Sequence, residues 1–354
     1  MTYPKTKEEN GRISCPECSK TFSDRSGFRY HWRKHNKVET NSIKEIGEMV
    51  IKSLEKRERL FPKDFKVKKG DLKPEVWNLL FSDLHYGQIV RGSEVGELAE
   101  YNTEIAKERV FTLAKKIVRF LEYYPNKPDE LVITFLGDNA DGSILRGNQQ
   151  SNIEFGICRQ SIEVVEIMSD FILFLSGYFK KIRCYGVYGN HTRLTQNPKD
   201  SAPSDNFDLL IYHFVKERLS GLKGITFEYT EAQHMIVEIA KHNFWIEHGD
   251  TVRGWAGFPS YGLSRQKANI QEMLGLTDNK ADYFMCGHFH QSYKAGNIHI
   301  NGAFVGGDLY SIGRLRKMGM PSQTLFGVQE NYGIVWERDI QLMKLKKGGV
   351  KIYK

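Results

Sequence analysis

The chain has 354 residues, of which 40% are hydrophobic and 27% are charged, and its formal net charge is +8. This composition supplies enough apolar residues for a sizeable core and excludes a generally disordered protein. No apolar run is long enough to cross a membrane and the N-terminal residues hold no apolar secretory core, so we expect a cytoplasmic protein without a membrane partner.

The positive charge is concentrated near the N-terminus. Residues 1–75 hold 19 Lys and Arg against 12 Asp and Glu, a net charge of +7, which leaves +1 for the rest of the chain. A polyanion such as nucleic acid is therefore best sought at this basic segment. A solvated leader without a partner explains the charge equally well.

Residues 11–37 are predicted to form a small zinc-binding unit. Two thiols and two imidazoles with C-x2-C-x12-H-x3-H spacing suit tetrahedral Zn2+, and they belong to Cys15, Cys18, His31 and His35. Phe22 and Phe28 supply apolar side chains to a unit that has almost no core without its metal. The pattern resembles a C2H2 zinc finger, which implies one structural Zn2+ and a ββα fold. The other three cysteines are expected to be buried thiols rather than disulfide partners.

The helix of this finger is the candidate contact surface for nucleic acid. In the finger family, the base-reading positions would fall here on Asp24, Gly27 and Tyr30, and glycine has no side chain with which to read a base. Four basic residues are candidate phosphate contacts: Arg25, Arg29, Arg33 and Lys34. We therefore expect weak, mainly electrostatic docking to nucleic acid, with a protein-binding or purely structural finger as the alternative.

Residues 38–74 are predicted to form a helix followed by a basic linker. Apolar residues recur at helical spacing over residues 40–61. Pro62, a lysine-rich run and Pro74 then interrupt the pattern, so we expect a domain boundary near residue 74.

Residues 75–345 are predicted to form one large α/β domain. The expected strands are 77–82, 131–136, 182–188, 225–229, 234–240, 243–247, 282–286, 292–301 and 332–342. The expected helices are 103–124, 153–179, 205–219 and 264–274. Strands that alternate with helices and then give way to strand-rich sequence are typical of a sandwich with mixed sheets.

Five short motifs follow predicted strands, and each carries side chains able to bind a metal ion. They are Asp83-Leu84-His85, Gly137-Asp138-Asn139-Ala140-Asp141, Gly189-Asn190-His191, His248-Gly249-Asp250 and Gly287-His288-Phe289-His290. In order and chemistry they resemble the signature of the calcineurin-like metallophosphoesterases, in particular the DNA-repair-exonuclease branch. The resemblance implies a four-layer αββα sandwich, and its combination with a finger suggests a phage-encoded protein. The remaining histidines, His234 among them, are expected to be ordinary core or surface residues.

The same resemblance implies a site for two divalent metal ions. The implied ligands are Asp83, His85 and His290 for one ion, Asn190, His248 and His288 for the other, and Asp138 as the bridge between them. A water or hydroxide between the ions would attack phosphorus. We expect Mn2+, with Fe or Zn2+ as alternatives, because His, Asp and Asn ligands suit all three.

A separate pair of residues is implied to donate a proton to the leaving group. His191 would be the general acid and Asp141 would orient it. Gly142 and Thr192 occupy the positions where the phosphoprotein-phosphatase branch carries Arg and Glu. These departures put a protein phosphatase in doubt and favour a diester substrate.

The expected function is hydrolysis of phosphodiester bonds in DNA or RNA. Arg314, Arg316 and Lys317 are further candidates for holding a polyanion. The glycine-rich segment 301–329 is expected to be either a substrate-facing loop, in which Tyr310 or Phe304 stacks on a base, or a plain surface connection. The alternative functions are a small-molecule or cyclic-nucleotide phosphodiesterase, a protein phosphatase, and a nucleic-acid-binding protein with an inactive metal site.

Overall fold

The computed structural model of the chain describes residues 8–9, 11–35, 45, 48–49, 51–52, 74–145, 147, 149–252 and 259–343. The chain divides into two compact units, Met1–Lys68 and Lys69–Lys354. The helix predicted over residues 40–61 falls largely outside the described residues.

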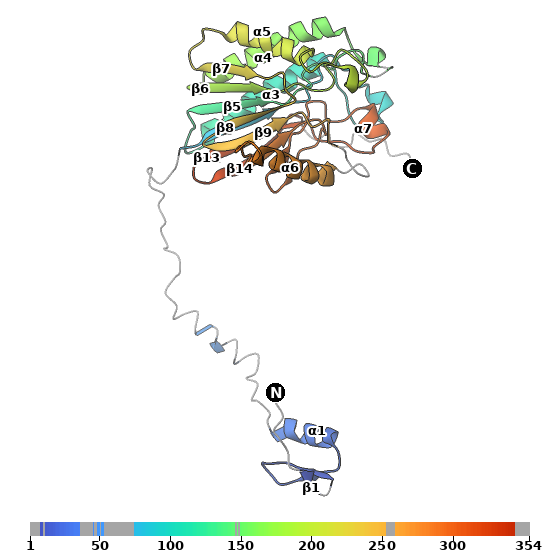
Figure 1. Ribbon diagram of the computed structural model, residues 1–354, viewed down its shortest axis with the longest axis vertical. Coiled ribbons are helices and arrows are strands. Elements are labelled where there is room, and N and C mark those ends of the chain that lie inside the picture. The colour runs from blue at the N-terminus through green and yellow to red at the C-terminus, as the bar shows by residue number, and fades with distance from the viewer. Residues whose placement is uncertain are drawn as a thin grey trace. The chain divides into compact units, whose positions relative to one another are not determined.

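In its described residues up to His35, the N-terminal unit is a three-stranded antiparallel sheet followed by one helix (Figure 1). Its elements are β1 (Glu8–Glu9), β2 (Arg12–Ser14), β3 (Thr21–Phe22) and α1 (Arg25–His35). The predicted ββα arrangement is present as β2, β3 and α1. Ile13, Cys15 and Phe28 form its small buried cluster, which is too small to hold the unit together by apolar burial alone.

The larger unit is built on a six-stranded sheet with the strand order β14-β13-β4-β5-β6-β7. The strands are β4 (Val76–Phe81), β5 (Glu130–Phe135), β6 (Lys181–Gly186), β7 (Ile225–Tyr229), β13 (Ser322–Gln329) and β14 (Gly333–Gln341). The strands from β4 to β7 are parallel, whereas β13 and β14 pair antiparallel. Near-continuous apolar runs in β4 and β5 are typical of strands buried on both faces.

A second sheet has five strands in the order β11-β12-β10-β9-β8. The strands are β8 (His234–Ile239), β9 (His242–Glu247), β10 (Tyr283–Cys286), β11 (Tyr293–Ala295) and β12 (Ile298–Ile300). Parallel pairing joins β9, β10 and β12, and the outer strands β8 and β11 are antiparallel to their neighbours. The single strand predicted over residues 292–301 is therefore a hairpin, because Gly296 and Asn297 turn the chain between β11 and β12.

The two sheets pack face to face, and helices cover their outer faces (Figure 1). Leu80 and Val132 of the first sheet meet Val237 and Phe244 of the second. The helices are α3 (Thr103–Tyr123), α4 (Ile157–Ser176) and α5 (Phe207–Leu219) on the first sheet, α6 (Pro259–Gly275) on the second, and the short α7 (Leu309–Gly313). This is the four-layer αββα sandwich that the sequence predicts. None of the helices in the described parts of the chain is long and apolar enough to span a membrane.

The segment from residue 301 to residue 329 differs from the sequence-based expectation. Its last 8 residues are β13, which lies between β4 and β14 and is buried along almost its whole length. Phe304 is fully buried and packs on Phe81 with ring centroids 4.7 Å apart, so the prediction that it stacks on a substrate base is wrong. The strand was missed because it is rich in polar residues. The side chains of these polar residues are buried and form hydrogen bonds. For example, the Ser82 amide donates a hydrogen bond to Oε1 of Gln323 over 2.8 Å.

Candidate active site

All five motifs lie just beyond the carboxyl ends of strands. Asp83, Asp138 and Asn190 follow β4, β5 and β6 of the first sheet, and His248 and His288 follow β9 and β10 of the second. These strands are parallel within each sheet, so their carboxyl ends share an edge. The structure thereby gathers side chains that are far apart in the sequence.

The turns that carry these side chains have an unusual backbone. Five candidate ligands adopt left-handed φ values: Asp83 (55°), His85 (43°), Asp138 (54°), His288 (69°) and His290 (57°). Such angles are uncommon for residues other than glycine, and they persist where the surrounding structure holds them in place. The rigid strands on either side therefore fix where these side chains point.

A first cluster consists of Asp83, His85 and His290, whose candidate ligand atoms lie within 4.8 Å of one another. Nε2 of His85 is 3.0 Å from Nε2 of His290, and Oδ1 of Asp83 is 3.4 Å from the same His290 atom. The backbone N–H of His288 donates to Oδ1 of Asp83 over 3.1 Å, which orients this carboxylate from the neighbouring motif. The three side chains converge as ligands of one cation would.

A second cluster consists of Asn190, Asp138, His248 and His288. Nε2 of His248 lies 3.0 Å from Oδ1 of Asn190 and 3.1 Å from Oδ2 of Asp138. Nδ1 of His288 is 3.3 Å from the same His248 nitrogen. The second ring nitrogen of His248, Nδ1, lies 2.7 Å from the backbone carbonyl oxygen of Leu136, which orients the ring.

Asp138 lies between the two clusters. Its Oδ1 accepts a hydrogen bond from the backbone N–H of His191 over 2.8 Å. Its Oδ2 is buried and accepts no hydrogen bond from any described residue, and it lies 3.1 Å from His248 Nε2 and 3.9 Å from His85 Nε2. A buried carboxylate oxygen without a hydrogen bond, among imidazole nitrogens, fits a bridge between two cations.

The charges in the site are strongly coupled. Burial alone would raise the pKa of Asp138, but the neighbouring His248 and His191 hold it well below its ordinary value. Burial and the neighbouring His248 lower the pKa of His288 to about 3, so its imidazole is neutral, as a metal ligand must be. The carboxylate and imidazole donor atoms fit divalent cations.

Asp141 contacts two histidines rather than one. Its Oδ1 lies 3.2 Å from Nδ1 of His191 and 3.2 Å from Nδ1 of His85. Nδ1 of His191 also lies 3.0 Å from the backbone carbonyl oxygen of Asp141. Gln149 donates to the other carboxylate oxygen over 3.1 Å. The sequence indicated only the contact with His191. The structure adds the contact with His85, through which the Asp141 carboxylate also orients this candidate ligand.

The sequence did not indicate a buried carboxylate, that of Asp208, which forms hydrogen bonds with two turns of the site. Asp208, at the start of α5, accepts hydrogen bonds from the backbone N–H groups of Asp138 (3.0 Å), Asn139 (3.2 Å) and Gly189 (2.9 Å) and from the hydroxyl of Thr192 (2.9 Å). It thereby joins the turn after β5 to the turn after β6. The only signal in the sequence is Asn206, which caps the helix and places a carboxylate in its first turn.

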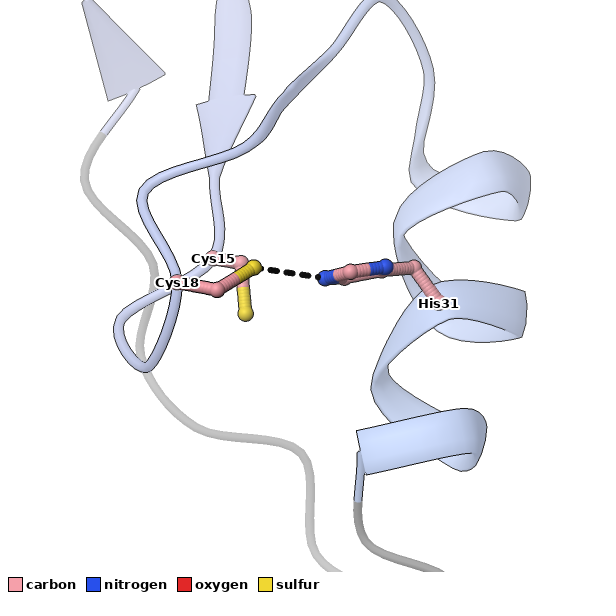
Figure 2. Close-up of side chains that lie close together, drawn as sticks. All are labelled: Cys15, Cys18 and His31. Carbon is pink, nitrogen blue, oxygen red and sulfur yellow. Dashed lines mark hydrogen bonds between the residues drawn. The ribbon is translucent and has the colours of Figure 1, made fainter.

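The N-terminal unit has its own candidate metal cluster. Cys15, Cys18 and His31 offer ligand atoms within 4.8 Å of one another, and Sγ of Cys18 lies 3.1 Å from Nε2 of His31 (Figure 2). The side chain of the fourth predicted ligand, His35, lies outside the described residues, as does that of Arg33.

The helix of this unit presents part of the predicted phosphate-contact set. Arg25, Arg29 and Lys34 are exposed, and Nζ of Lys34 lies 5.2 Å from the ring centre of Tyr30. Oδ1 of Asp24, a candidate base-reading residue, instead accepts a hydrogen bond from the Gly27 amide over 2.7 Å. This bond caps the helix and leaves less of Asp24 available to a base.

We predict that Asp208→Asn weakens metal binding. In the wild type, both carboxylate oxygens of Asp208 accept hydrogen bonds from backbone N–H groups. Asparagine keeps one acceptor oxygen but replaces the other with an NH2 group, which cannot accept from an N–H donor. The turns after β5 and β6 therefore lose part of their shared hydrogen bonding. Loss of such an outer-shell partner typically costs about 10- to 100-fold in metal affinity. Calorimetric titration with Mn2+ would measure the loss of metal affinity, with Asp205→Asn, a substitution of an exposed residue, as the control. Equal affinities for Asp208→Asn and the control would refute this role.

Comparison with known proteins places the larger unit in a family. Residues 79–292 match the model for calcineurin-like phosphoesterases. The SPbeta prophage-derived uncharacterized protein YonJ of Bacillus subtilis (strain 168) is 21% identical over 245 residues, which cover 69% of this chain. The chain spans only 56% of the length of that relative.

Two solved structures are similar at low sequence identity. A dimetal phosphatase from Danio rerio is 11% identical, with 76% of this chain and 100% of that chain covered and a TM-score of 0.37. Vacuolar protein sorting 29 from Cryptosporidium parvum is 14% identical, with 72% and 86% covered and a TM-score of 0.31. Both likenesses are distant, and no functional conclusion rests on them. The family match covers more than half of the chain and contains the motifs of both buried clusters, so the chain belongs to the calcineurin-like phosphoesterases.

Proposed function

We propose that this enzyme hydrolyses phosphodiester bonds of nucleic acid, with His191 as the general acid. The observation that carries the proposal is the arrangement of Asp141, Gly142 and His191 beside the two clusters. When bound, two divalent cations, Mn2+ in our proposal, supply Lewis acidity to the phosphoryl group and make a water acidic enough to attack near neutral pH. The remaining requirement is a proton for the leaving alkoxide.

His191 is held in a position to supply that proton. Asp141 lies beside Nδ1 of the ring, so donation to a leaving oxygen falls to Nε2. Burial would raise the pKa of Asp141, but hydrogen bonds with His191 and His85 lower it well below its ordinary value. The ionised carboxylate stabilises the protonated imidazole, which is the form that a general acid needs.

Gly142 favours a diester over a phosphoprotein. Its φ of 77° lies in the region that favours glycine, and a Cβ at this position would overlap the carbonyl oxygen of His191. An arginine that grips a phosphate monoester therefore cannot be accommodated here without a shift of the His191 turn. The position supports a substrate with two ester groups and fewer free phosphate oxygens.

A basic loop beside the first cluster supports a polymeric substrate. A Cβ at Gly319 would overlap the carbonyl oxygen of His290, so the loop that contains α7 packs against the backbone of this candidate ligand. Arg314 and Arg316 are exposed on the loop, and neither forms an ion pair with any residue that the structure describes. Tyr310 is 46% exposed beside them. Cations and an aromatic ring suit a nucleic-acid strand.

The substrate class can be decided with a panel of phosphoesters. We expect the Mn2+-loaded protein to cleave single-stranded DNA, duplex DNA or RNA, and Asp138→Ala to abolish cleavage because both clusters lose their shared carboxylate. Cyclic nucleotides and p-nitrophenyl phosphate, assayed in parallel, represent the phosphodiesterase and phosphatase alternatives. Activity confined to cyclic nucleotides or to the monoester would overturn the nuclease proposal.

His191→Ala tests the general acid separately. It should lower kcat/KM for diesters with an alkoxide leaving group by about 100- to 10,000-fold, because the alkoxide then leaves without a proton. p-Nitrophenyl diesters should be affected far less, since p-nitrophenolate is a good leaving group. His213→Ala, an exposed histidine on α5, is the matched control. Equal losses of kcat/KM for both types of diester would refute the role of His191 as the general acid.

We further propose that the N-terminal unit binds one structural Zn2+ and docks the enzyme to nucleic acid. The grouping of Cys15, Cys18 and His31 supports the zinc site, because thiolates and imidazole suit Zn2+ and the unit has little core of its own. Exposed basic residues on α1 support contact with phosphates.

Cys15→Ser tests both parts of this proposal in the full-length chain. It should lower the zinc content, measured by elemental mass spectrometry, by one ion per chain, because one ligand is lost. Binding to a DNA duplex at low salt should weaken as well, since α1 loses its support. Cys158→Ser should change neither quantity. This cysteine of the larger unit is exposed, so the expectation that it is a buried thiol is wrong. Unchanged zinc content would refute the proposed zinc site, and unchanged DNA affinity would refute the proposed docking role.

A further inference from the structure

A cavity of about 240 Å3 lies beside the second cluster, at the carboxyl end of β9 and the start of β8. His248 of the cluster contributes to its wall, followed by Asp250 and Thr251. The cavity is smaller than the ~300–1,000 Å3 pockets that enclose whole drug-sized ligands. Its size and position suit one portion of a substrate whose phosphate lies at the clusters.

One wall of the cavity is a stacked pair of aromatic rings. The His234 ring lies on the indole of Trp245 with centroids 3.9 Å apart and an interplanar angle of 12°. Trp245 is only 3% exposed, and its Nε1 donates to Oε2 of Glu247 over 2.9 Å, which fixes the indole. Burial lowers the pKa of His234, which leaves an uncharged ring. Such a flat, fixed and neutral surface suits stacking with another flat ring.

Among the described residues that line the cavity, none is Lys or Arg and two carry carboxylates. Glu247 and Asp250 both line it, and Oε1 of Glu247 accepts from Nε2 of Gln266 over 2.8 Å. Carboxylates repel a phosphate but accept hydrogen bonds from amino groups, such as those on the edges of cytosine, adenine and guanine. Met273 of α6 adds an apolar contact.

We propose that this cavity binds the nucleobase of the nucleotide next to the scissile phosphate, by stacking on His234 and by hydrogen bonds from base amino groups to Glu247 or Asp250. The inference rests on the proposed function, since it requires a nucleotide diester at the clusters. It gives His234, an ordinary residue by sequence, a role in substrate binding. It also explains why an aromatic pair and two carboxylates border a metal site that acts on an anion.

The test compares nucleoside diesters, which carry a base, with a diester that has no nucleoside. The substrates are the p-nitrophenyl esters of 2′-deoxycytidine and thymidine 5′-monophosphate and bis(p-nitrophenyl) phosphate, hydrolysed by the full-length Mn2+-loaded protein. The readout is kcat/KM for a nucleoside ester divided by kcat/KM for bis(p-nitrophenyl) phosphate. His234→Ala should lower this ratio by about 5- to 100-fold, as loss of one base–aromatic stack would.

Two further variants separate stacking from a general disturbance. His234→Phe retains a flat ring and should keep most of the ratio. Glu247→Gln should reduce the preference for the deoxycytidine ester over the thymidine ester, because thymine has no exocyclic amino group. His213→Ala, outside the cavity, should leave the ratio unchanged.

The outcomes distinguish this inference from the function on which it rests. If bis(p-nitrophenyl) phosphate is cleaved and His234→Ala leaves the ratio unchanged, base binding in the cavity is refuted while the diesterase stands. If no diester is cleaved, the proposed function fails and the inference fails with it. A reduced ratio in His234→Ala that His234→Phe restores supports base stacking.

Discussion

The site depends on one buried carboxylate, that of Asp138. Burying a charge in a protein is costly unless partners compensate it. The backbone N–H of His191 satisfies Oδ1, whereas Oδ2 lies among imidazoles and accepts no hydrogen bond from the described residues. Metal ions at this oxygen would compensate its negative charge, and their remaining ligands would come from both clusters. Cation binding and the final ordering of the turns are therefore expected to be coupled.

The sandwich explains how one carboxylate can serve two clusters. The first sheet carries Asp83, Asp138 and Asn190 beyond its strands, and the second sheet carries His248 and His288. Packing of the two sheets brings these edges together, and the buried cluster between them keeps them in register. Strained left-handed residues are tolerated here because rigid strands precede each turn.

The side chains that converge in the two clusters could be predicted from the sequence because each lies in a short motif after an apolar strand. Features that depend on tertiary packing could not. Asp208 contacts two turns only because α5 begins beneath them. Phe304 was misassigned because the polar strand β13 resembles a loop when its buried hydrogen bonds are unknown. The second contact of Asp141, with His85, likewise follows from the fold and from no local pattern.

The chemistry proposed here divides the substrate among neighbouring surfaces. In this proposal the phosphate would lie at the clusters, His191 would protonate the leaving group, the loop with Arg314 and Arg316 would hold the polyanion, and the cavity at His234 would receive a base. All of these roles require that two cations bind on either side of Asp138.

The most direct test is anomalous X-ray diffraction from crystals of the Mn2+-loaded protein. The account predicts two manganese peaks about 3.5–4 Å apart, with the Asp138 carboxylate between them. One peak should lie beside Asp83 and His290, and the other beside Asn190 and His248. A single peak, or two peaks that do not share Asp138, would contradict it.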